Sequence, residues 1–408
     1  MSFKFLQKII LKILIILFYP VYLLYDLINK FYNFKLIEIS GVRLGHYIGE
    51  LTLWYLENKN KKETNRTIWV CDRSTCNEFF FKKIKKKIII TKNYFFKLLI
   101  ESNKYYDKSK KNILLTGPIS KDRDILDLIN KNETIITFSK KEISEGEKLI
   151  KQMGIKENQE FICICSRDHS YLKKNLSNHD YDYLDYKNSN IENYNLMTKN
   201  LNKKNISVIR MGRESEKKWS LDGKINFDYS VSKFRSGFLD LYLVFRSKFV
   251  VTTGTGFYIL PTILKKPLVI VDFLPIDHCV TYVKNSIHIF KHLYDEKKKT
   301  LLKLDELISQ KYQFLFKQKD YSSRNLRVID NSPEEINDCV MEMNDRLDKR
   351  WIETAKDQYN QNYFWKIYPK NRVVNFYDNK KKYKQFLHGK IYSKIGSNYL
   401  KKYIDLKN

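Results

Sequence analysis

Residues 249–271 read FVVTTGTGFYILPTILKKPLVIV, and this stretch predicts a complete strand–turn–helix–strand unit. Phe249–Thr253 and Leu268–Val271 are short apolar runs rich in β-branched residues, which is typical of buried strands. Phe257–Lys265 lies between them and reads as a helix. Because two strands joined by a helix run parallel in one sheet, this unit predicts an α/β fold with a parallel sheet.

The same alternation extends along most of the chain in two series. The first series predicts strands at Leu36–Ser40, Thr67–Cys71, Ile88–Ile90 and Ile113–Leu115, and helices at Glu50–Asn58, Asn77–Lys86, Phe95–Tyr105 and Asp124–Asn130. The second series adds strands at Phe161–Cys165 and Ile206–Met211, and helices at Ile191–Leu201 and Phe238–Phe245. We therefore predict two Rossmann-like parallel-sheet domains facing across a cleft, with a ligand held at the carboxyl ends of strands from both.

The predicted domain bounds follow from these series. They are a membrane-associated amphipathic helix at 1–34, an N-terminal Rossmann-like domain at 35–155, a C-terminal Rossmann-like domain at 156–333, and a helical basic segment at 334–408. The polar stretch Gly146–Gln159 is the predicted hinge between the two domains.

The composition bounds the class of protein. The 408 residues carry 75 Lys and Arg against 46 Asp and Glu, a net charge of +29, and 43% hydrophobic residues, which excludes wholesale disorder. The basic excess indicates an anionic partner: nucleic acid, an acidic lipid surface or a phosphorylated small molecule. The six cysteines show neither zinc-pair spacing nor a disulfide framework, which favours a reducing, cytosolic compartment.

Residues 1–28, MSFKFLQKIILKILIILFYPVYLLYDLI, predict an amphipathic helix kinked at Pro20. Its polar members fall on one narrow stripe: Lys4, Lys8, Lys12, Tyr19, Tyr22 and Asp26. This pattern is typical of a helix lying in the membrane interface with its lysines toward anionic headgroups. A membrane-spanning helix and a helix packed on the protein's own core are the alternatives. No small-residue cleavage site supports a signal peptide.

The turn after the strand Phe249–Thr253 is the first candidate site. Its residues are Gly254, Thr255 and Gly256, and the free amides at the start of the following helix would form a cradle for a diphosphate. The alternative is a tight turn with no ligand. The turn is neither a GxGxxG fingerprint nor a Walker loop.

Arginines end two other strands of the second series. Arg167 follows Phe161–Cys165 and could bind a phosphate through two parallel hydrogen bonds, with Asp168 orienting it or contacting the ligand itself. Arg210 ends a neighbouring strand and would join this site if it lies in the same cleft. A surface ion pair and a solvated arginine are the respective alternatives.

The first series offers a histidine after its first strand. Arg43, Gly45 and His46 lie on the glycine-punctuated loop predicted at Gly41–Gly49, and Glu50 begins the helix that follows. His46 could remove a proton from an acceptor hydroxyl, because its unperturbed pKa is near neutral. The alternative is a histidine that satisfies the hydrogen bonds of a turn.

Taken in order, these pieces resemble a family of bacterial glycosyltransferases encoded in surface-polysaccharide gene clusters. The resemblance rests on Arg43-Leu-Gly-His46, Ser166-Arg167-Asp168-x-x-Tyr171-Leu172, His179-Asp-Tyr … Tyr186-Lys187-Asn188-Ser189-x-Ile191-x-x-Tyr194, Val208-Ile-Arg-Met-Gly212, Phe238-Leu-Asp240, Thr253-Gly254-Thr255-Gly256 and Phe386-Leu-His-Gly389 … Ile395-Gly396 … Leu400. It covers nearly the whole chain after the N-terminal helix. Lys187 departs from the arginine that the family leads us to expect, and supplies charge without a bidentate fork.

The resemblance implies a GT-B enzyme that moves a sugar from a nucleotide-sugar donor to a lipid-linked or growing glycan acceptor. Together with the N-terminal helix, this predicts a peripheral or monotopic protein at the cytoplasmic face of the bacterial inner membrane. The donor would be held by Arg167 and the glycine turn, with Arg210 and Lys187 as helpers. His46 and Asp168 are the catalytic candidates; His46 resembles in position the histidine in the glycine-rich loop of the GlcNAc transferase of peptidoglycan synthesis. No cofactor is expected, and no metal either, because arginine and helix amides would stabilise the leaving diphosphate.

Three other functions stay open. A nucleic-acid-binding protein would account for the charge, but no recognised motif of that kind is present, so no nucleic-acid partner is expected. A nucleotide-sugar epimerase would have the same fold and would turn over free nucleotide sugar without an acceptor. A non-catalytic, glycan-binding scaffold would not bind a donor.

Overall fold

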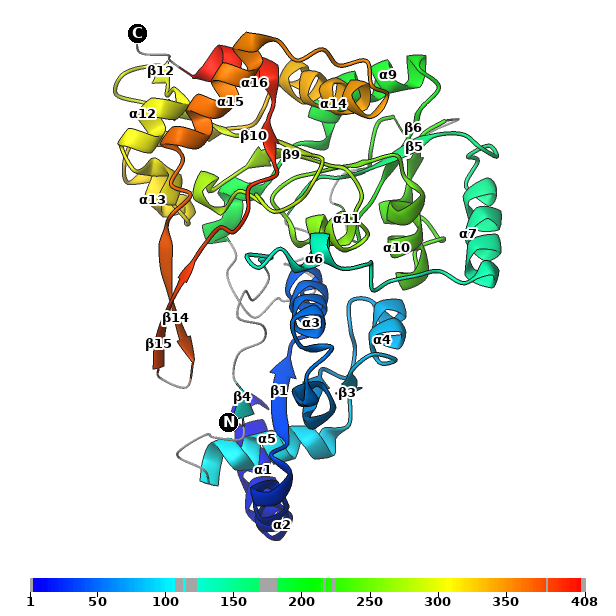
Figure 1. Cartoon of the computed structure of the whole chain (residues 1–408), viewed down its shortest axis with the longest axis vertical. Coiled ribbons are helices and arrows are strands. Elements are labelled where there is room, and N and C mark those ends of the chain that lie inside the picture. The colour runs from blue at the N-terminus through cyan, green and yellow to red at the C-terminus, as the bar shows by residue number, and fades with distance from the viewer. Residues whose placement is uncertain are drawn as a thin grey trace. The chain divides into compact units, whose positions relative to one another are not determined.

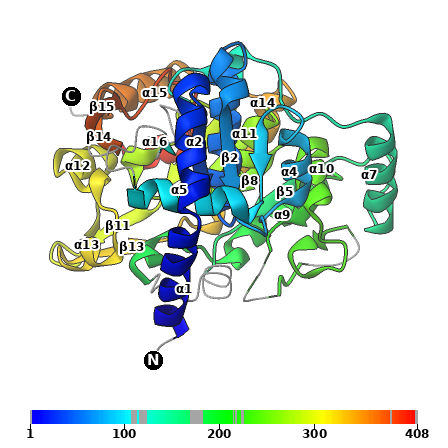
Figure 2. The same ribbon diagram turned by 90° about the horizontal axis from the view of Figure 1, so that it is seen from below.

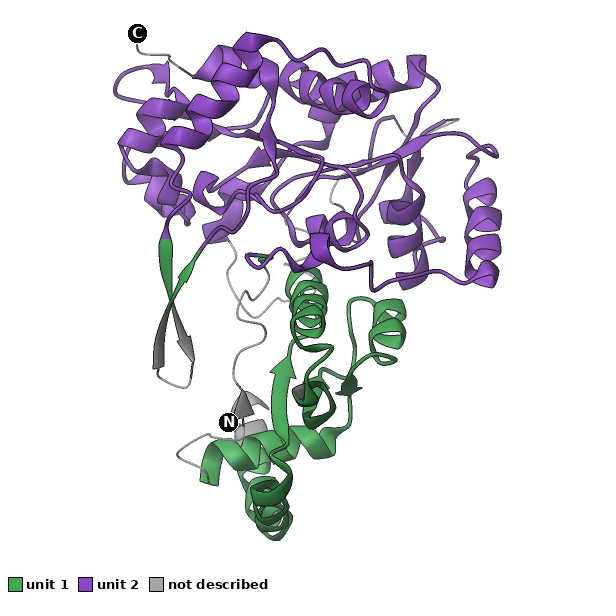
Figure 3. Cartoon of the chain, in the orientation of Figure 1, with its two compact units in different colours: residues 1–124, 373–386 green, residues 125–372, 387–408 purple. Residues whose placement is uncertain are grey.

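The computed structural model describes residues 3–106, 113–114, 123–168, 182–213, 215, 218–221, 225–378 and 381–404. The chain forms two compact units, which Figure 3 distinguishes by colour. Unit 1 comprises residues 1–124 and 373–386, and unit 2 comprises residues 125–372 and 387–408. The predicted boundary at residue 155 therefore lies inside unit 2. The stretch predicted as a hinge begins inside helix α7 (Lys140–Gln152), where a Cβ added at Gly146 would overlap the Tyr242 ring.

Unit 1 contains a four-stranded, all-parallel sheet in the order β3-β2-β1-β4 (Figure 1). Its strands are β1 (Lys35–Ile39), β2 (Thr67–Cys71), β3 (Ile89–Thr91) and β4 (Ile113–Leu114), and its later helices are α3 (Leu44–Asn58), η1 (Lys62–Arg66), α4 (Glu78–Ile84) and α5 (Tyr94–Tyr106). One part of its core joins the sheet to α5 through Leu36, Val70, Leu99 and Ile100. The predicted strand Thr67–Cys71 is β2 residue for residue.

The N-terminal segment forms two helices where one was predicted. They are α1 (Phe3–Leu17) and α2 (Tyr19–Tyr32), and the chain bends at Phe18, just ahead of Pro20 in the first turn of α2. Among the described residues, no single helix has the length and apolar character to cross a bilayer. The pair Ile9–Leu17 and Tyr19–Tyr32 meets that criterion jointly, with a bend of 57° between its halves.

Unit 2 contains a seven-stranded, all-parallel sheet in the order β16-β10-β9-β8-β5-β6-β7. The strands are β5 (Phe161–Cys165), β6 (Ser207–Arg210), β7 (Phe227–Asp228), β8 (Val250–Thr252), β9 (Leu268–Phe273), β10 (Ser286–Phe290) and β16 (Lys394–Ile395). Numbered from β5 in chain order, the first six strands lie in the order 3-2-1-4-5-6, which is the doubly wound arrangement. The predicted α/β class with a parallel sheet is confirmed.

The remaining elements cover or extend this sheet. In the described part of unit 2, the α-helices besides α7 are α6 (Leu128–Lys131), α9 (Asn195–Lys203), α10 (Gly237–Arg246), α11 (Ile259–Ile263), α12 (Leu304–Ser309), α13 (Gln318–Ser322), α14 (Pro333–Leu347), α15 (Ala355–Ile367) and α16 (Ser397–Tyr403). A small antiparallel sheet pairs β11 (His292–Asp295) with β12 (Thr300–Leu301) and β13 (Leu326–Ile329). The segment 334–408, predicted to be helical, also contains β16 and the hairpin β14–β15 (Val373–Asp378, Lys381–Phe386), which belongs to unit 1.

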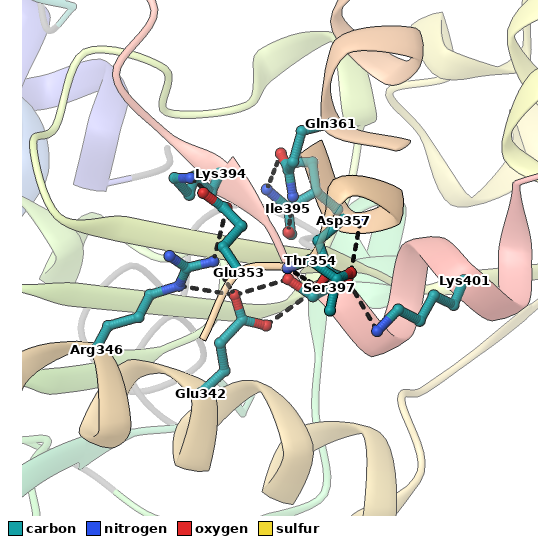
Figure 4. A network of polar contacts seen from close by, with 10 residues as sticks. All are labelled: Glu342, Arg346, Glu353, Thr354, Asp357, Gln361, Lys394, Ile395, Ser397 and Lys401. Carbon is teal, nitrogen blue, oxygen red and sulfur yellow. Dashed lines mark hydrogen bonds and ion pairs between the residues drawn. The ribbon is translucent and has the colours of Figure 1, made fainter. Parts of the chain in front are cut away.

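A polar network fastens the C-terminal segment to α14 and α15 (Figure 4). The buried Glu342 carboxylate accepts from the Ser397 backbone N–H at 2.7 Å and from its hydroxyl at 3.0 Å. Ile395 and Gln361 exchange two hydrogen bonds, in which the Gln361 amide acts as a further strand partner. These bonds hold β16 against β10, so the last strand of the sheet depends on side chains from two helices.

Candidate functional site

The carboxyl edge of the unit 2 sheet has a topological switch point between β5 and β8. These strands are adjacent, with Cys165 paired to Thr252, and the chain leaves them toward opposite halves of the sheet. In doubly wound sheets, ligands bind in the crevice at this point because the two connections diverge there. Arg167 and Asp168 follow β5, and the Gly254–Gly256 turn follows β8. The structure therefore brings the predicted donor residues of these two segments to one position in the fold.

The turn after β8 is held by its own backbone and hydroxyls. The Thr252 hydroxyl donates to the Cys165 carbonyl at 3.0 Å, and the Thr255 hydroxyl caps the next helical turn by accepting from Phe257 N–H at 3.1 Å. A Cβ at Gly254 would lie 3.1 Å from the Phe273 ring, so close packing is one reason for this glycine. The Thr253 hydroxyl is buried and has no hydrogen-bond partner among the described residues.

A second segment, Asn188–Asn190, lies beside Arg167. The Ser189 N–H donates to the Arg167 carbonyl at 3.0 Å, and Arg167 Nε donates to the Asn188 side-chain oxygen at 3.4 Å. Arg167 is half-buried, and these contacts fix its backbone carbonyl and its Nε atom. Lys187, immediately before this segment, is half-buried with its ammonium 5.5 Å from the centre of the Tyr186 ring.

Asp272, at the end of β9, holds the segment Asn188–Asn190 through Ser189. This residue was not predicted from the sequence. Its side chain is 1% exposed, accepts from the Ser189 hydroxyl and accepts from the Asn331 backbone N–H at 2.6 Å. Its own N–H donates to the Asn331 side chain at 2.7 Å, and its φ is +50°. Burial raises the pKa of Asp272 to about 6, with the Asp330 charge adding to the rise and Lys291 opposing it.

Lys291 and Asp330 also hold the segment Asn188–Asn190, and together with Asp272 they form a clamp on it. The ammonium side chain of Lys291 is 2% exposed, donates to the Asn188 carbonyl and pairs with Asp330 at 2.6 Å. Asp330 in turn accepts from the Asn190 N–H at 3.3 Å. These contacts tie the ends of β5, β9, β10 and β13 to one short segment. The buried Lys291 was not among the residues predicted from the sequence.

Arg210 is buried in an ion pair inside unit 2. Its side chain is 3% exposed and pairs at 3.1 Å with Asp228, which is fully buried. The same carboxylate accepts from Trp219 N–H at 3.3 Å and from Ser230 N–H at 3.2 Å. Because Arg210 is enclosed and held by this pair, we leave it out of the donor site that the sequence predicted for it.

The carboxyl edge of the unit 1 sheet carries His46, but not on a loop. Helix α3 already begins at Leu44, so Gly45 and His46 lie in its first turn, and the predicted glycine loop is wrong. Arg43 is the N-cap residue and is exposed. His46 Nδ1 lies 3.3 Å from a Glu50 carboxylate oxygen one turn later, and the two side chains are 49% and 23% exposed.

The neighbouring loop after β2 supports this helix start. Asp72 accepts from the Gly41 N–H at 2.9 Å and the Ser40 hydroxyl at 3.2 Å, which joins the ends of β1 and β2. A Cβ at Gly41 would lie 2.8 Å from Thr75, so no other residue fits there without displacement. Lys92, at the end of β3, pairs with Glu78 at 2.5 Å. No group of three or more potential ligands for a metal ion occurs in the described part of the chain.

Several residues of the family resemblance fall elsewhere. Tyr171, Leu172 and His179–Tyr181 lie outside the described residues. His388 is buried between the Tyr368 hydroxyl at 3.1 Å and the Thr281 hydroxyl at 3.3 Å, and this contact pins the C-terminal tail.

The chain thus forms two parallel-sheet units, each with polar residues at the carboxyl edge of its sheet, and the larger sheet is doubly wound. No protein-family model and no curated protein matches the chain. Among solved structures it is similar to E. coli ADP-heptose LPS heptosyltransferase II, with 11% identity, 63% of this chain and 90% of that chain covered, and a TM-score of 0.38. It is also similar to a glycosyl transferase family 9 protein from Veillonella parvula DSM 2008 (11%, 76% and 97%, 0.43) and to UDP-GlcNAc 2-epimerase from Methanocaldococcus jannaschii (12%, 75% and 76%, 0.27). At these TM-scores the likeness does not carry a functional assignment, so we derive function from the site residues.

Proposed function

We infer that the protein is a glycosyltransferase that uses a nucleotide-sugar donor and a glycan acceptor. The observation that supports this most is the switch point of unit 2, where a half-buried arginine and a glycine turn follow two adjacent strands, β5 and β8. A nucleoside diphosphate has the size and charge for such an edge. The family resemblance of the sequence favours sugar transfer over the other uses of a bound nucleotide.

On the donor side, Arg167 would pair with the diphosphate, since its planar fork matches two phosphate oxygens. The amides of Gly254 and Gly256 would donate further hydrogen bonds, whereas the Thr255 amide already donates to the Thr253 carbonyl at 2.7 Å. Lys187 would add positive charge from the segment clamped by Asp272. As the bond to the sugar breaks, these donors would stabilise the charge on the leaving diphosphate, so the proposal needs neither a cofactor nor a metal. Asp168, which also follows β5, would act in catalysis by orienting Arg167 or by contacting the ligand itself.

On the acceptor side, His46 would act as general base. Glu50 lies on the Nδ1 side of the imidazole and would hold its proton there, which leaves Nε2 to accept the proton of the acceptor hydroxyl. Arg43 and Gly45 would flank the acceptor at the exposed start of α3. We place this activity at the cytoplasmic face of the bacterial inner membrane, on a lipid-linked or growing glycan.

The decisive experiment is a binding titration with UDP, GDP, CMP and dTDP sugars on the purified full chain. Arg167→Ala should weaken binding of the preferred nucleotide by at least about 10-fold, the loss expected for a charged hydrogen bond. Arg324→Ala, an exposed arginine of the same unit, is the matched control and should leave binding unchanged. Equal affinities for the wild type and Arg167→Ala would remove the donor site.

The histidine is tested separately. His46→Ala should lower turnover by about 10²–10⁴-fold with donor affinity unchanged, and Glu50→Gln should lower it less, because it disturbs only the orientation of the ring. Full activity in His46→Ala would exclude it as the base. Turnover of free nucleotide sugar without any acceptor would instead identify an epimerase. The absence of any donor binding would identify a scaffold.

A further inference from the structure

Helices α1 and α2 expose large apolar side chains along their whole length. These residues are Phe5, Leu6, Ile10, Ile13, Ile16 and Leu17 on α1, and Leu23, Leu24, Leu27, Ile28 and Phe31 on α2, with exposed fractions from 40% to 79%. A continuous apolar surface of this extent is rare on a protein that stays in water. We propose that this face of unit 1 lies in the plane of one leaflet of an anionic lipid bilayer. The proposal deepens the membrane location given above and does not depend on sugar transfer.

The opposite side of the two helices packs on α5. The inward residues are Ile15, Phe18, Tyr22, Tyr25 and Asn29, spaced three and four apart as on one face of a helix. Phe18 meets Phe95 with ring centres 5.2 Å apart, and Tyr22 stacks on Tyr106 at 5.3 Å. Phe18 and Tyr25 also contact the core cluster of unit 1.

This packing reverses the predicted role of the polar stripe on α2. Tyr22 is 7% exposed, Asp26 is half-buried, and Tyr19, although 42% exposed, has its ring 4.7 Å from that of Tyr106 on α5, so the stripe lies toward the protein and not toward the lipid headgroups. At about 100° per residue, Phe31 lies about 180° around the helix from Tyr22, which puts the most exposed phenylalanine at the centre of the outward face. Lys12 on α1 is exposed as predicted, and the side chains of Lys4 and Lys8 lie outside the described residues.

The same packing argues for a helix pair lying in the membrane plane and not for one that spans it. With a rise of about 1.5 Å per residue, each helix is about 21–23 Å long, shorter than the roughly 30 Å hydrocarbon core. Figure 2 shows both helices in front of α5, along one side of unit 1. Crossing the bilayer would detach Tyr22 and Phe18 from the aromatic rings of α5, and β1 begins at Lys35, only three residues after α2 ends.

The charge of unit 1 selects the lipid. Residues 1–124 hold 24 Lys and Arg against 11 Asp and Glu. Lys12 and Lys30 are exposed on the two helices, whereas their one acidic residue, Asp26, is half-buried. Basic residues beside an apolar face are attracted to anionic headgroups, and that attraction weakens as salt screens it. A second copy of this chain would bring the same positive charge to the face, which disfavours self-association as its occupant.

The test is co-sedimentation of the full chain with vesicles of phosphatidylcholine containing phosphatidylglycerol. The triple variant Leu17→Glu/Leu24→Glu/Phe31→Glu alters only outward side chains and should reduce partitioning by at least about 100-fold. Ile352→Glu, at an 85% exposed apolar position in unit 2, is the matched control and should bind as the wild type does. Pure phosphatidylcholine and high salt should each weaken binding.

Depth separates the in-plane and spanning arrangements. Tryptophan placed at position 17, 24 or 31 should be quenched by lipids brominated near the headgroups to a similar extent at all three positions. If the tryptophan at position 17 were quenched by lipids brominated deep in the bilayer, and the one at position 31 by lipids brominated near the headgroups, the in-plane arrangement would be overturned. Wild-type binding by the triple variant would overturn the docking face. Lipid-free dimers that the triple variant abolishes, without vesicle binding by the wild type, would assign the face to a second copy. Donor binding is measured apart from all of these, so either proposal can fail alone.

Discussion

Replacing Asp272 by Asn tests the buried carboxylate beneath the candidate donor site. Asn suits the position, because its side chain has the same shape and tolerates the left-handed φ of +50°. It can still accept from the Asn331 N–H, while its amide group turns toward the Ser189 hydroxyl. The substitution therefore removes the charge and keeps most of the clamp.

The expected effect is on how stability depends on pH. Burial, with the Asp330 charge, raises the pKa of Asp272 from an ordinary 3.8 to about 6, against the pull of Lys291. A group with a raised folded-state pKa favours the folded state below its unfolded pKa, and this contribution is lost as the pH rises through the folded pKa. A rise of the pKa from 3.8 to about 6 corresponds to roughly 3 kcal/mol in the free energy of unfolding. The free energy of unfolding of Asp272→Asn, measured relative to that of the wild type, should therefore rise by roughly 3 kcal/mol between pH 4 and pH 7.

Urea unfolding of both proteins, in matched buffers at each pH, measures that difference. Asp338→Asn, an exposed acid on α14 in the same unit, is the control and should follow the wild type across the range. A difference that stays constant from pH 4 to pH 7 would refute a raised pKa at Asp272. A difference of opposite sign would mean that Lys291 holds the carboxylate ionised.

Two further predictions concern the C-terminal part of unit 2. Gly389→Ala should destabilise the unit by about 3 kcal/mol or more in urea unfolding, because its Cβ would overlap the Ile125 backbone, while the exposed Lys390→Ala should cost little; equal midpoints would show that the tail adjusts freely. Burial alone would raise the pKa of Glu335, but hydrogen bonds and charge, chiefly from His292 at 2.7 Å, lower it to about 2. Its stabilisation is present above about pH 4.5 and is lost as the pH falls toward 2. Glu335→Gln should accordingly cost roughly 3 kcal/mol at pH 7, and wild-type stability at that pH would exclude this pairing.

Strands buried on both faces were predictable from the sequence. Phe161–Cys165 and Thr67–Cys71 match β5 and β2 residue for residue as largely apolar runs, because a central parallel strand has no solvent face to interrupt its pattern. β10 and β16 were not predicted. β16 is only two residues long and exists because Gln361 bonds to both backbone groups of Ile395 across 34 positions of sequence.

Local composition misled the reading of α3 and of the N-terminus. Two glycines near His46 suggested a loop, yet α3 buries Tyr47, Ile48 and Leu51, and this packing outweighs the low helix propensity of glycine. On α2, the sequence period located the polar stripe correctly, but only the presence of α5 decides that this stripe faces inward. A period gives the two faces of a helix and not which one meets the protein.

The candidate donor site divides in the same way. Strand order placed Arg167 and the Gly254–Gly256 turn together, because any residue that directly follows β5 or β8 must lie at the switch point. Arg210 satisfied the same rule and is nevertheless enclosed, since Asp228 ends the adjacent strand β7 and pairs with it. The end of a strand determines the position of the residue that follows it. Whether the side chain of that residue can contact a ligand depends on the residues of the neighbouring strand.

The motif around Lys187–Ser189 shows why resemblance to a family does not by itself identify ligand contacts. Tyr194 is buried, and Ser189 bonds to Asp272 and to the Arg167 carbonyl, so these two motif residues hold the segment in place. Their effect on function would pass through Arg167, whose side chain the same segment contacts. Ser189→Ala is therefore expected to weaken donor binding less than Arg167→Ala, and to do so more strongly as temperature rises and the clamp loosens.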